Sequence, residues 1–157
     1  MSAKKVALLI IDVQKSAVTK QKLPKKIEEF QNNYTNIFVS IFQNKQSPIL
    51  KILNWSGYKD EALAFQPIPK AFVFHKSGYT SYLSKMKDFT EIHLCGFDTD
   101  ACIYKTAMDL IENGIRPIIL KDLCFSRNET LHRMGLKLLE RNIGANNIKL
   151  SNMLFKK

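Results

Sequence analysis

Short apolar runs alternate with amphipathic stretches along most of the chain. The first run, residues 6–11, is continuous, rich in β-branched side chains and ends at Asp12. Its length and composition are typical of a strand buried on both faces. By the same criteria, strands are predicted at residues 6–11, 49–53, 71–74, 92–95, 115–120 and 147–150.

Amphipathic stretches between these runs predict three helices. Residues 24–43 carry apolar side chains at spacings of three and four, and Pro24 suits a first helical turn. A second helix follows residue 102 and stops at Asn113 and Gly114. A third covers about residues 128–142. Residues 54–70, with their glycine and prolines, predict an irregular connection.

Strands that alternate with helices indicate an α/β fold. We expect a three-layer α/β/α, Rossmann-like arrangement with a mainly parallel sheet of about six strands. The chain has 157 residues and no internal repeat or linker. These features predict one domain spanning residues 1–157.

Composition narrows the class of protein. The three cysteines, without a CxxC spacing, favour a reducing cytoplasm and argue against a zinc site. We expect no membrane span, because no segment approaches about 20 apolar residues. We also expect no signal peptide, because the first residues lead directly into a strand.

The net charge of +10 raises nucleic acid as a partner. However, the basic residues are twenty lysines and only four arginines, spread along the chain without a nucleic-acid-binding motif. A solvated lysine-rich surface is the preferred interpretation, so no nucleic-acid partner is expected.

Candidate chemistry begins with Cys102, which stands at the start of a predicted helix, just beyond a predicted strand. A helix N-terminus favours an anion and can lower a thiol pKa from roughly 8.5. A cysteine in this place can equally be a buried packing residue. Its position alone therefore leaves a nucleophile, a redox thiol and an inert thiol open.

Two more residues follow predicted strands: Asp12 after residues 6–11 and Lys76 after residues 71–74. Ligands of open parallel sheets bind beyond the carboxyl ends of the strands. Each residue alone has an ordinary interpretation, as a turn residue or a solvated lysine. Together with Cys102 they supply a base, a cation and a thiol. Lys76 would have to reach inward, because its strand is expected further from the sheet centre.

The chain resembles the isochorismatase-like cysteine hydrolases, a family that includes nicotinamidases and N-carbamoylsarcosine amidohydrolases. The resemblance rests on the residues 9–14 (Leu-Ile-Ile-Asp-Val-Gln), on Lys76, and on residues 96–103 (Gly-Phe-Asp-Thr-Asp-Ala-Cys-Ile). It spans the chain from about residue 7 to residue 154. Residues 106–109 and 121–127 also look like the downstream segments of the family.

The resemblance implies a role for each residue. Asp12 would be the general base, Lys76 would hold the charges in place, and Cys102 would attack a carbonyl to form a thioester. In the family, the peptide bond that corresponds to Phe97–Asp98 is cis. The backbone N–H groups of Asp98 and Cys102 would then form an oxyanion hole.

The chain also departs from the family. Nicotinamidases carry an Asp-x-His pair that binds a metal, and the matching stretch here is Asn54-Trp55-Ser56. The histidines, His75, His93 and His132, are far apart in the sequence and are expected to be structural or exposed. The sequence therefore predicts no metal site and no cofactor.

Residues expected near the substrate pocket are Gln14, Trp55, Phe65, Tyr79 and Phe97. Cys95 and Cys124 are expected to be packing residues.

The first functional hypothesis is a hydrolase of a small amide or related C–N bond that acts through a Cys102 thioester. An isochorismatase-type vinyl-ether hydrolase and a non-catalytic binding member of the family are the alternatives. The partner would be a small molecule, and the resemblance implies a homo-oligomer, either a dimer or a tetramer.

Overall fold

A single sheet of six parallel strands forms the centre of the molecule, in the order β3-β2-β1-β4-β5-β6. The computed structural model describes residues 3–155. The strands are β1 (Val6–Ile11), β2 (Ile37–Phe42), β3 (Phe72–Lys76), β4 (Glu91–Phe97), β5 (Arg116–Phe125) and β6 (Ile148–Lys149). The α-helices are α1 (Leu23–Phe30), α2 (Pro48–Ile52), α3 (Tyr104–Glu112) and α4 (Glu129–Ile143). A π-helical turn, η3 (Thr99–Ile103), precedes α3.

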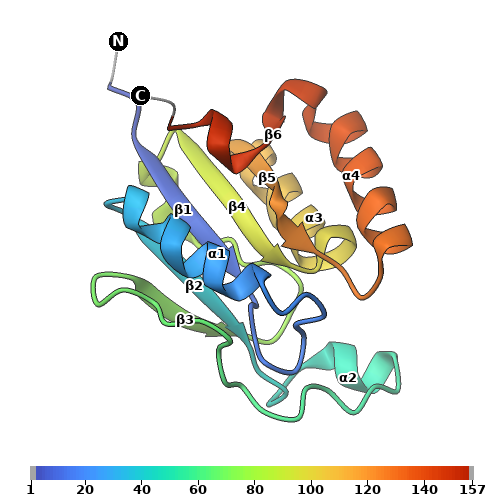
Figure 1. Cartoon of the computed structure of the whole chain (residues 1–157). Helices are drawn as coiled ribbons and strands as arrows, with labels where there is room; N and C mark the ends of the chain where they lie inside the picture. The colour runs from blue at the N-terminus through green and yellow to red at the C-terminus, as the bar shows by residue number, and fades with distance from the viewer. Residues whose placement is uncertain (1–2, 156–157) are drawn as a thin grey trace.

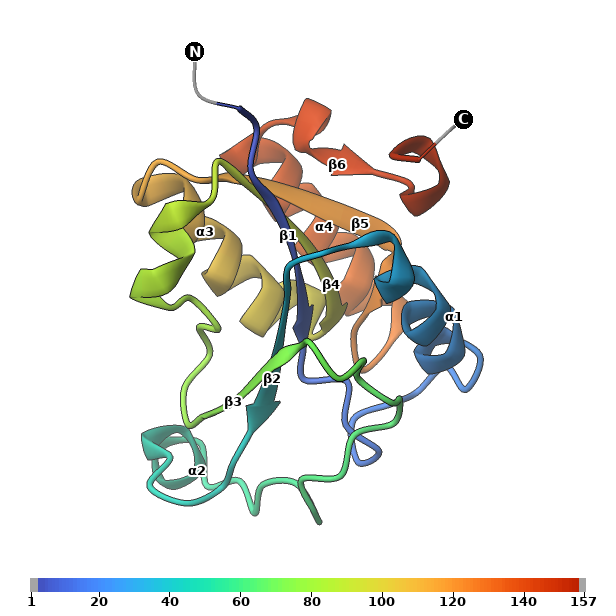
Figure 2. The same cartoon turned by 90° about the vertical axis from the view of Figure 1, so that its left-hand side faces the viewer.

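β1 lies between β2 and β4, and its apolar side chains point alternately to the two faces of the sheet. Leu9 and Ile11 belong to the core beneath α3 and α4, whereas Leu8 and Ile10 belong to the core beneath α1. Figure 1 and Figure 2 show these helices on opposite sides of the sheet. The expected three-layer fold is therefore confirmed, and all strand pairs are parallel.

The prediction of one helix over residues 24–43 is wrong beyond its first part. α1 ends at Phe30, and Ile37–Phe42 forms β2, with every residue buried. In a run that is apolar at nearly every position, helical and strand spacings are both satisfied. The six-residue length and burial on both faces decide for a strand.

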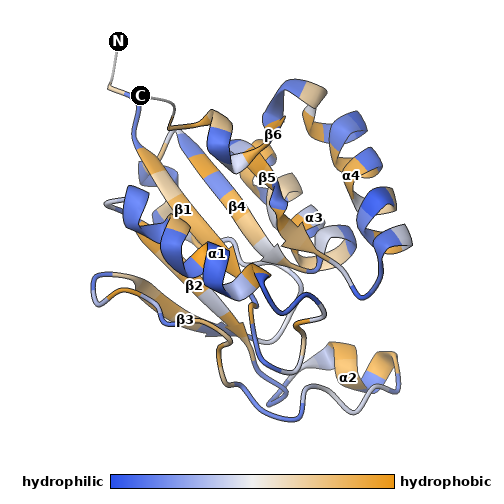
Figure 3. Ribbon diagram, in the orientation of Figure 1, coloured by the Kyte–Doolittle hydropathy of each residue, from blue (hydrophilic) through white to orange (hydrophobic). Residues whose placement is uncertain are grey.

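The prediction of a strand over residues 49–53 is also wrong, because Pro48–Ile52 forms the short helix α2. Pro48 stands in the first turn, where its fixed φ and missing N–H are tolerated. Ile52 is 80% exposed, so this apolar run is not a buried strand. Figure 3 shows α2 as an apolar segment near the carboxyl ends of the strands.

Within residues 3–155 no helix has the length and apolar character needed to cross a membrane.

Candidate active site

The carboxyl ends of β1 and β4 lie side by side and lead into two of the candidate residues. Ile11 of β1 is paired with Gly96 of β4. Asp12 follows β1 with a φ of 51° and is only 1% exposed. Left-handed conformations are uncommon for residues other than glycine and cluster at functional sites. The backbone thus holds the Asp12 carboxylate at the end of the sheet.

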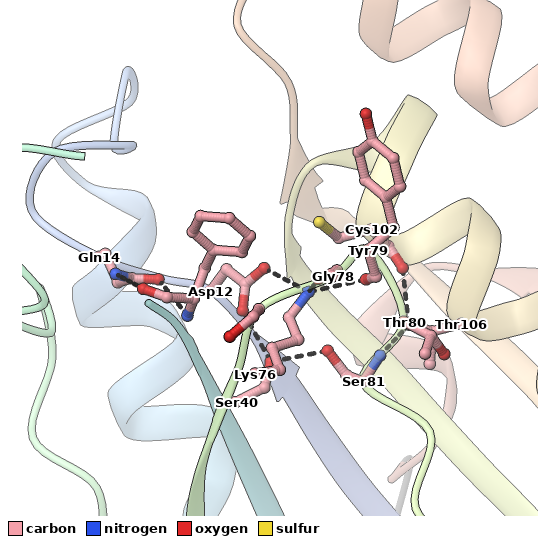
Figure 4. Close-up of polar contacts among 12 residues, drawn as sticks. Asp12, Gln14, Ser40, Lys76, Gly78, Tyr79, Thr80, Ser81, Cys102 and Thr106 are labelled. Atoms are coloured by element: carbon pink, nitrogen blue, oxygen red, sulfur yellow. Dashed lines mark hydrogen bonds and ion pairs between the residues drawn. The ribbon is translucent and has the colours of Figure 1, made fainter. Parts of the chain in front are cut away.

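Lys76 ends the edge strand β3, and its side chain reaches inward over β2 to Asp12. Its Nζ lies 2.8 Å from Asp12 Oδ2. The ammonium also donates to the carbonyl oxygens of Gly78 at 3.1 Å and Tyr79 at 2.7 Å (Figure 4). An ammonium group has three hydrogens, so these acceptors satisfy it completely. The cation is fixed in place although β1 and β3 are not paired.

Cys102 lies on η3, the turn that joins β4 to α3. The Asp98 carbonyl oxygen accepts hydrogen bonds from the N–H groups of Ala101 and Ile103, each at 3.1 Å. Cys102 as a residue is partly exposed, and its thiol faces the Asp12–Lys76 pair (Figure 4). The three candidate residues therefore meet at one place.

The thiol of Cys102 does not have the lowered pKa expected from a helix N-terminus. Burial, reinforced by the negative charge of Asp12, raises the pKa of Cys102 to about 12, while Lys76 opposes this shift. The thiol is therefore protonated at neutral pH, and any reaction that used its sulfur as a nucleophile would require a base.

Asp12 and Lys76 shape each other's protonation. Burial raises the pKa of Asp12, and the adjacent Lys76 ammonium and the Ser40 hydroxyl counteract that increase. Burial alone would lower the pKa of Lys76, but Asp12 and Cys102 raise it above its ordinary value of 10.5. Lys76 thus remains a cation at neutral pH, and Asp12 is the group suited to accept a proton.

The end of β4 and its junction with η3 have an unusual backbone. The Phe97–Asp98 peptide bond is cis, and Gly96 has a φ of 116°. A Cβ at Gly96 would lie 2.2 Å from the backbone oxygen of Ile11. Only glycine fits at this position, because β1 approaches the turn too closely for a side chain.

A cavity of about 540 Å³ opens above the three candidate residues. Asp12 and Cys102 line it, and so do three of the residues expected near the substrate: Trp55, Tyr79 and Phe97. Lys76 lies beneath, behind Asp12 and the Tyr79 carbonyl.

Two expected pocket residues lie elsewhere. Gln14 is fully buried, and its amide group pairs with the backbone of Phe42 through bonds of 3.0 and 2.8 Å. Phe65 is 6% exposed and packs in the core beneath α1. Gln14 therefore joins β2 to the loop after β1, whereas Phe65 is a core residue.

The cavity also contains residues that the sequence did not single out. Phe42 and Tyr58 form an aromatic wall with Trp55, with ring centroids 5.1 to 5.8 Å apart. Asp98 and the exposed Arg127 line the same cavity. Arg127 lies just beyond β5, so the rule on strand ends could have identified it. Phe42 falls within the predicted helix over residues 24–43, so the sequence does not mark it as the end of a strand.

The three histidines and the two remaining cysteines do not line the cavity. His93 is buried and bonded to Tyr34 and Glu91, and His132 is bonded to Thr99. His75 pairs with Glu61 at 3.2 Å on the surface. Cys95 and Cys124 are buried. Among residues 3–155, no group of three or more His, Cys, Asp or Glu side chains is arranged to hold a metal ion.

Comparisons with known proteins identify the family of this chain. The family model described as isochorismatase domain matches residues 6–149. Isochorismatase family protein 2A of Dictyostelium discoideum is 24% identical over 161 residues, which cover 90% of this chain and 76% of that protein. Isochorismatase domain-containing protein 2 of Bos taurus is 29% identical over 80 residues, covering 51% of this chain but only 39% of the bovine protein.

Solved structures agree on the fold. Nicotinamidase PncA from Bacillus subtilis superimposes with a TM-score of 0.72 at 19% identity, covering 90% of this chain and 97% of that one. N-carbamoylsarcosine amidase from Thermoplasma acidophilum has a TM-score of 0.75 at 19% identity, covering 94% of this chain and 97% of the amidase. Since the family model covers most of the sequence, this chain belongs to the isochorismatase domain family.

Proposed function

We propose that this chain hydrolyses a small-molecule amide or a related C–N bond, with Cys102 as the nucleophile. The observation that carries the proposal is the ion pair between Lys76 and Asp12, 2.8 Å long, next to a cavity that both Asp12 and Cys102 line. A thiol, a base and a fixed cation are the groups that covalent acyl transfer needs.

In the first half-reaction the Cys102 sulfur would attack the carbonyl carbon of the substrate. The thiol proton passes to the Asp12 carboxylate as the C–S bond forms. Asp12 then gives this proton to the leaving nitrogen, and the C–N bond breaks to leave a thioester. A protonated resting thiol fits this order of events, because the proton leaves only when the bond forms.

In the second half-reaction water would attack the thioester carbon. Asp12 takes a proton from the water and returns it to the sulfur as the C–S bond breaks. The backbone N–H groups of Asp98 and Cys102 are the proposed donors to the oxyanion in both steps. Lys76 stays protonated throughout and holds Asp12 in place.

The cavity favours a small substrate with a flat or apolar part. Phe42, Trp55 and Tyr58 provide an aromatic wall, and the exposed Arg127 provides a positive charge in the lining. The names of two structural neighbours, nicotinamidase and N-carbamoylsarcosine amidase, describe amidases and support amide chemistry.

Two other functions within the family use the same cavity. An isochorismatase-type vinyl-ether hydrolase would not need the thiol, so Cys102 favours amide chemistry. A non-catalytic binding member would not need the buried Asp12–Lys76 pair, whose burial carries a desolvation cost. Replacement of Cys102 therefore distinguishes the vinyl-ether hydrolase and the binding protein from an amide hydrolase that acts through a thioester.

A panel of small amides and ureido compounds tests the proposal, with release of ammonia or amine as the signal. We expect Cys102→Ala to abolish turnover while the melting temperature changes little, because Cys102 is a small residue that is only partly buried. Cys124→Ala, at a buried thiol outside the cavity, is the matched control and should keep its turnover. Turnover that survives in Cys102→Ala would reject the thioester route.

A further inference from the structure

A chain of buried hydroxyl groups connects Asp12 with the backbone of Cys102. Ser40 Oγ donates to Asp12 Oδ1 at 2.8 Å, and Ser81 Oγ donates to Ser40 Oγ at 2.8 Å. The Ser81 N–H donates to Thr106 Oγ1 at 2.9 Å, and Thr106 Oγ1 donates to the Cys102 carbonyl oxygen at 2.6 Å. Figure 4 shows this path.

The residues of this hydrogen-bonded series come from separate parts of the fold. Ser40 is in β2, Ser81 is in the loop after β3, and Thr106 is in α3, while Asp12 follows β1. Ser40, Ser81 and Thr106 are at most 1% exposed. Buried hydroxyls require partners, and each of these donates its hydrogen to the next member of the chain.

The direction of the hydrogen bonds is fixed by the carboxylate. An ionised Asp12 only accepts, so Ser40 must give its single hydrogen to Oδ1 and accept from Ser81. Lys76 occupies Oδ2. Both carboxylate oxygens are therefore held, and the hydroxyl chain favours the ionised form.

The loop after β3 serves the site in three ways. Gly78 and Tyr79 hold the Lys76 ammonium through their carbonyl oxygens. Ser81 uses its side chain toward Asp12 and its backbone toward Cys102. Residues 78–81 thus bind Lys76 directly, and they reach Asp12 through Ser40 and Cys102 through Thr106.

We infer that Ser81 is a positioning residue, which acts through Ser40 and Thr106 to fix Asp12 against Cys102. The inference rests on the proposed function and deepens it. Ser40 and Thr106 are positioning residues too, and we call the hydrogen-bonded series Ser40, Ser81 and Thr106 the brace. None of these three residues lines the cavity.

Alkylation of Cys102 by iodoacetamide, followed against pH by peptide mass spectrometry, tests the brace without a known substrate. The native rate should rise with pH as Asp12 ionises, and Asp12→Asn should remove this step. Ser40→Ala should move the step upward by about one pH unit, because a hydrogen bond to a charged oxygen is lost. Ser81→Ala should move it less and in the same direction.

A double mutant separates the brace from general loosening. Ser40→Ala/Ser81→Ala should match Ser40→Ala alone, because both substitutions act through one hydrogen bond to Asp12. Thr106→Val should lower the rate at every pH without moving the step, and Thr106→Ser should restore the native rate. Tyr34→Phe, which removes a buried hydroxyl bonded to His93, is the control and should leave the profile unchanged.

A folded Ser40→Ala protein with the native profile would overturn the brace. If Ser40→Ala does not fold, Ser81→Ala decides, because it retains the N–H bond to Thr106. If the variants shift the alkylation profile but the protein hydrolyses no amide, the positioning role of the brace is supported and the proposed function is rejected. Turnover that depends on Cys102, combined with unshifted profiles, would retain the proposed function and reject the brace.

Discussion

Lys76 Nζ lies 2.8 Å from Asp12 Oδ2, although β2 separates the strands that end at these residues. The pair is buried, with the two side chains 7% and 1% exposed. Its position brings a cation and a base together beneath the thiol of Cys102. The proposed chemistry uses both groups of this contact.

Removing one partner of the pair should destabilise the protein strongly. Lys76→Met leaves the Asp12 carboxylate buried without its cation, and we expect a loss of about 3–5 kcal/mol in the free energy of unfolding at pH 7. The double variant Asp12→Asn/Lys76→Met should recover most of this loss. Urea denaturation measures both effects. A Lys76→Met protein as stable as the native one would show that the pair has no structural role.

The rate of hydrolysis should fall on the acidic side. Asp12 must be ionised to accept the thiol proton, and burial raises its pKa above the ordinary value of 3.8. As the pH falls through this raised pKa, Asp12 gains a proton and the rate decreases. Lys76 has a raised pKa and does not limit the rate at neutral pH. A pH–rate profile that stays flat below pH 3.8 would contradict the role of Asp12.

Gly96 should not tolerate a side chain. It has a φ of 116°, and a Cβ at this position would lie only 2.2 Å from the backbone oxygen of Ile11. Gly96→Ala should therefore lose about 2–5 kcal/mol in the free energy of unfolding and most of the activity. Gly78→Ala is the control, since no heavy atom beyond its own residue and its two chain neighbours lies within 4 Å of its Cβ position. Equal melting temperatures for the two variants would show that the turn can accept a side chain at residue 96.

Two aromatic residues should separate binding from folding. Trp55 lines the cavity, and its ring centroid lies 5.1 Å from that of Tyr58. Trp55→Ala should therefore raise KM for a small amide with little change in stability. Phe65 lies in the core, so Phe65→Leu should cost about 1–2 kcal/mol in stability and leave KM unchanged. The opposite pattern would move the substrate site away from the aromatic wall.

Much of the fold is predictable because buried strands and amphipathic helices have different periods. Residues 6–11 are wholly apolar, and their short length, β-branched side chains and end at Asp12 favour a buried strand. Residues 37–42 are easily mistaken for part of a helix, because an almost wholly apolar run satisfies both periods. Residues 49–53 are easily mistaken for a strand, because the exposure of Ile52 and Leu53 is decided by the rest of the fold.

The candidate residues can be found from the sequence because Asp12, Lys76 and Cys102 stand at or just beyond the carboxyl ends of strands, and these ends meet at one edge of the sheet. The protonation of the thiol cannot be predicted in this way, since burial outweighs the helix N-terminus. Ser40 and Ser81 cannot be recognised either. A serine in a strand or a loop is ordinary, and only the tertiary contacts show that both support Asp12.

The most direct test of the thioester mechanism is mass spectrometry of the protein quenched in acid during turnover of an active amide. We predict an acyl group, equal in mass to the substrate without its amine, on the peptide that contains Cys102. Asp12→Asn should form this adduct more slowly, and Cys102→Ala should not form it. Turnover with no adduct on Cys102, or an adduct on Cys95 or Cys124 instead, would contradict the thioester mechanism.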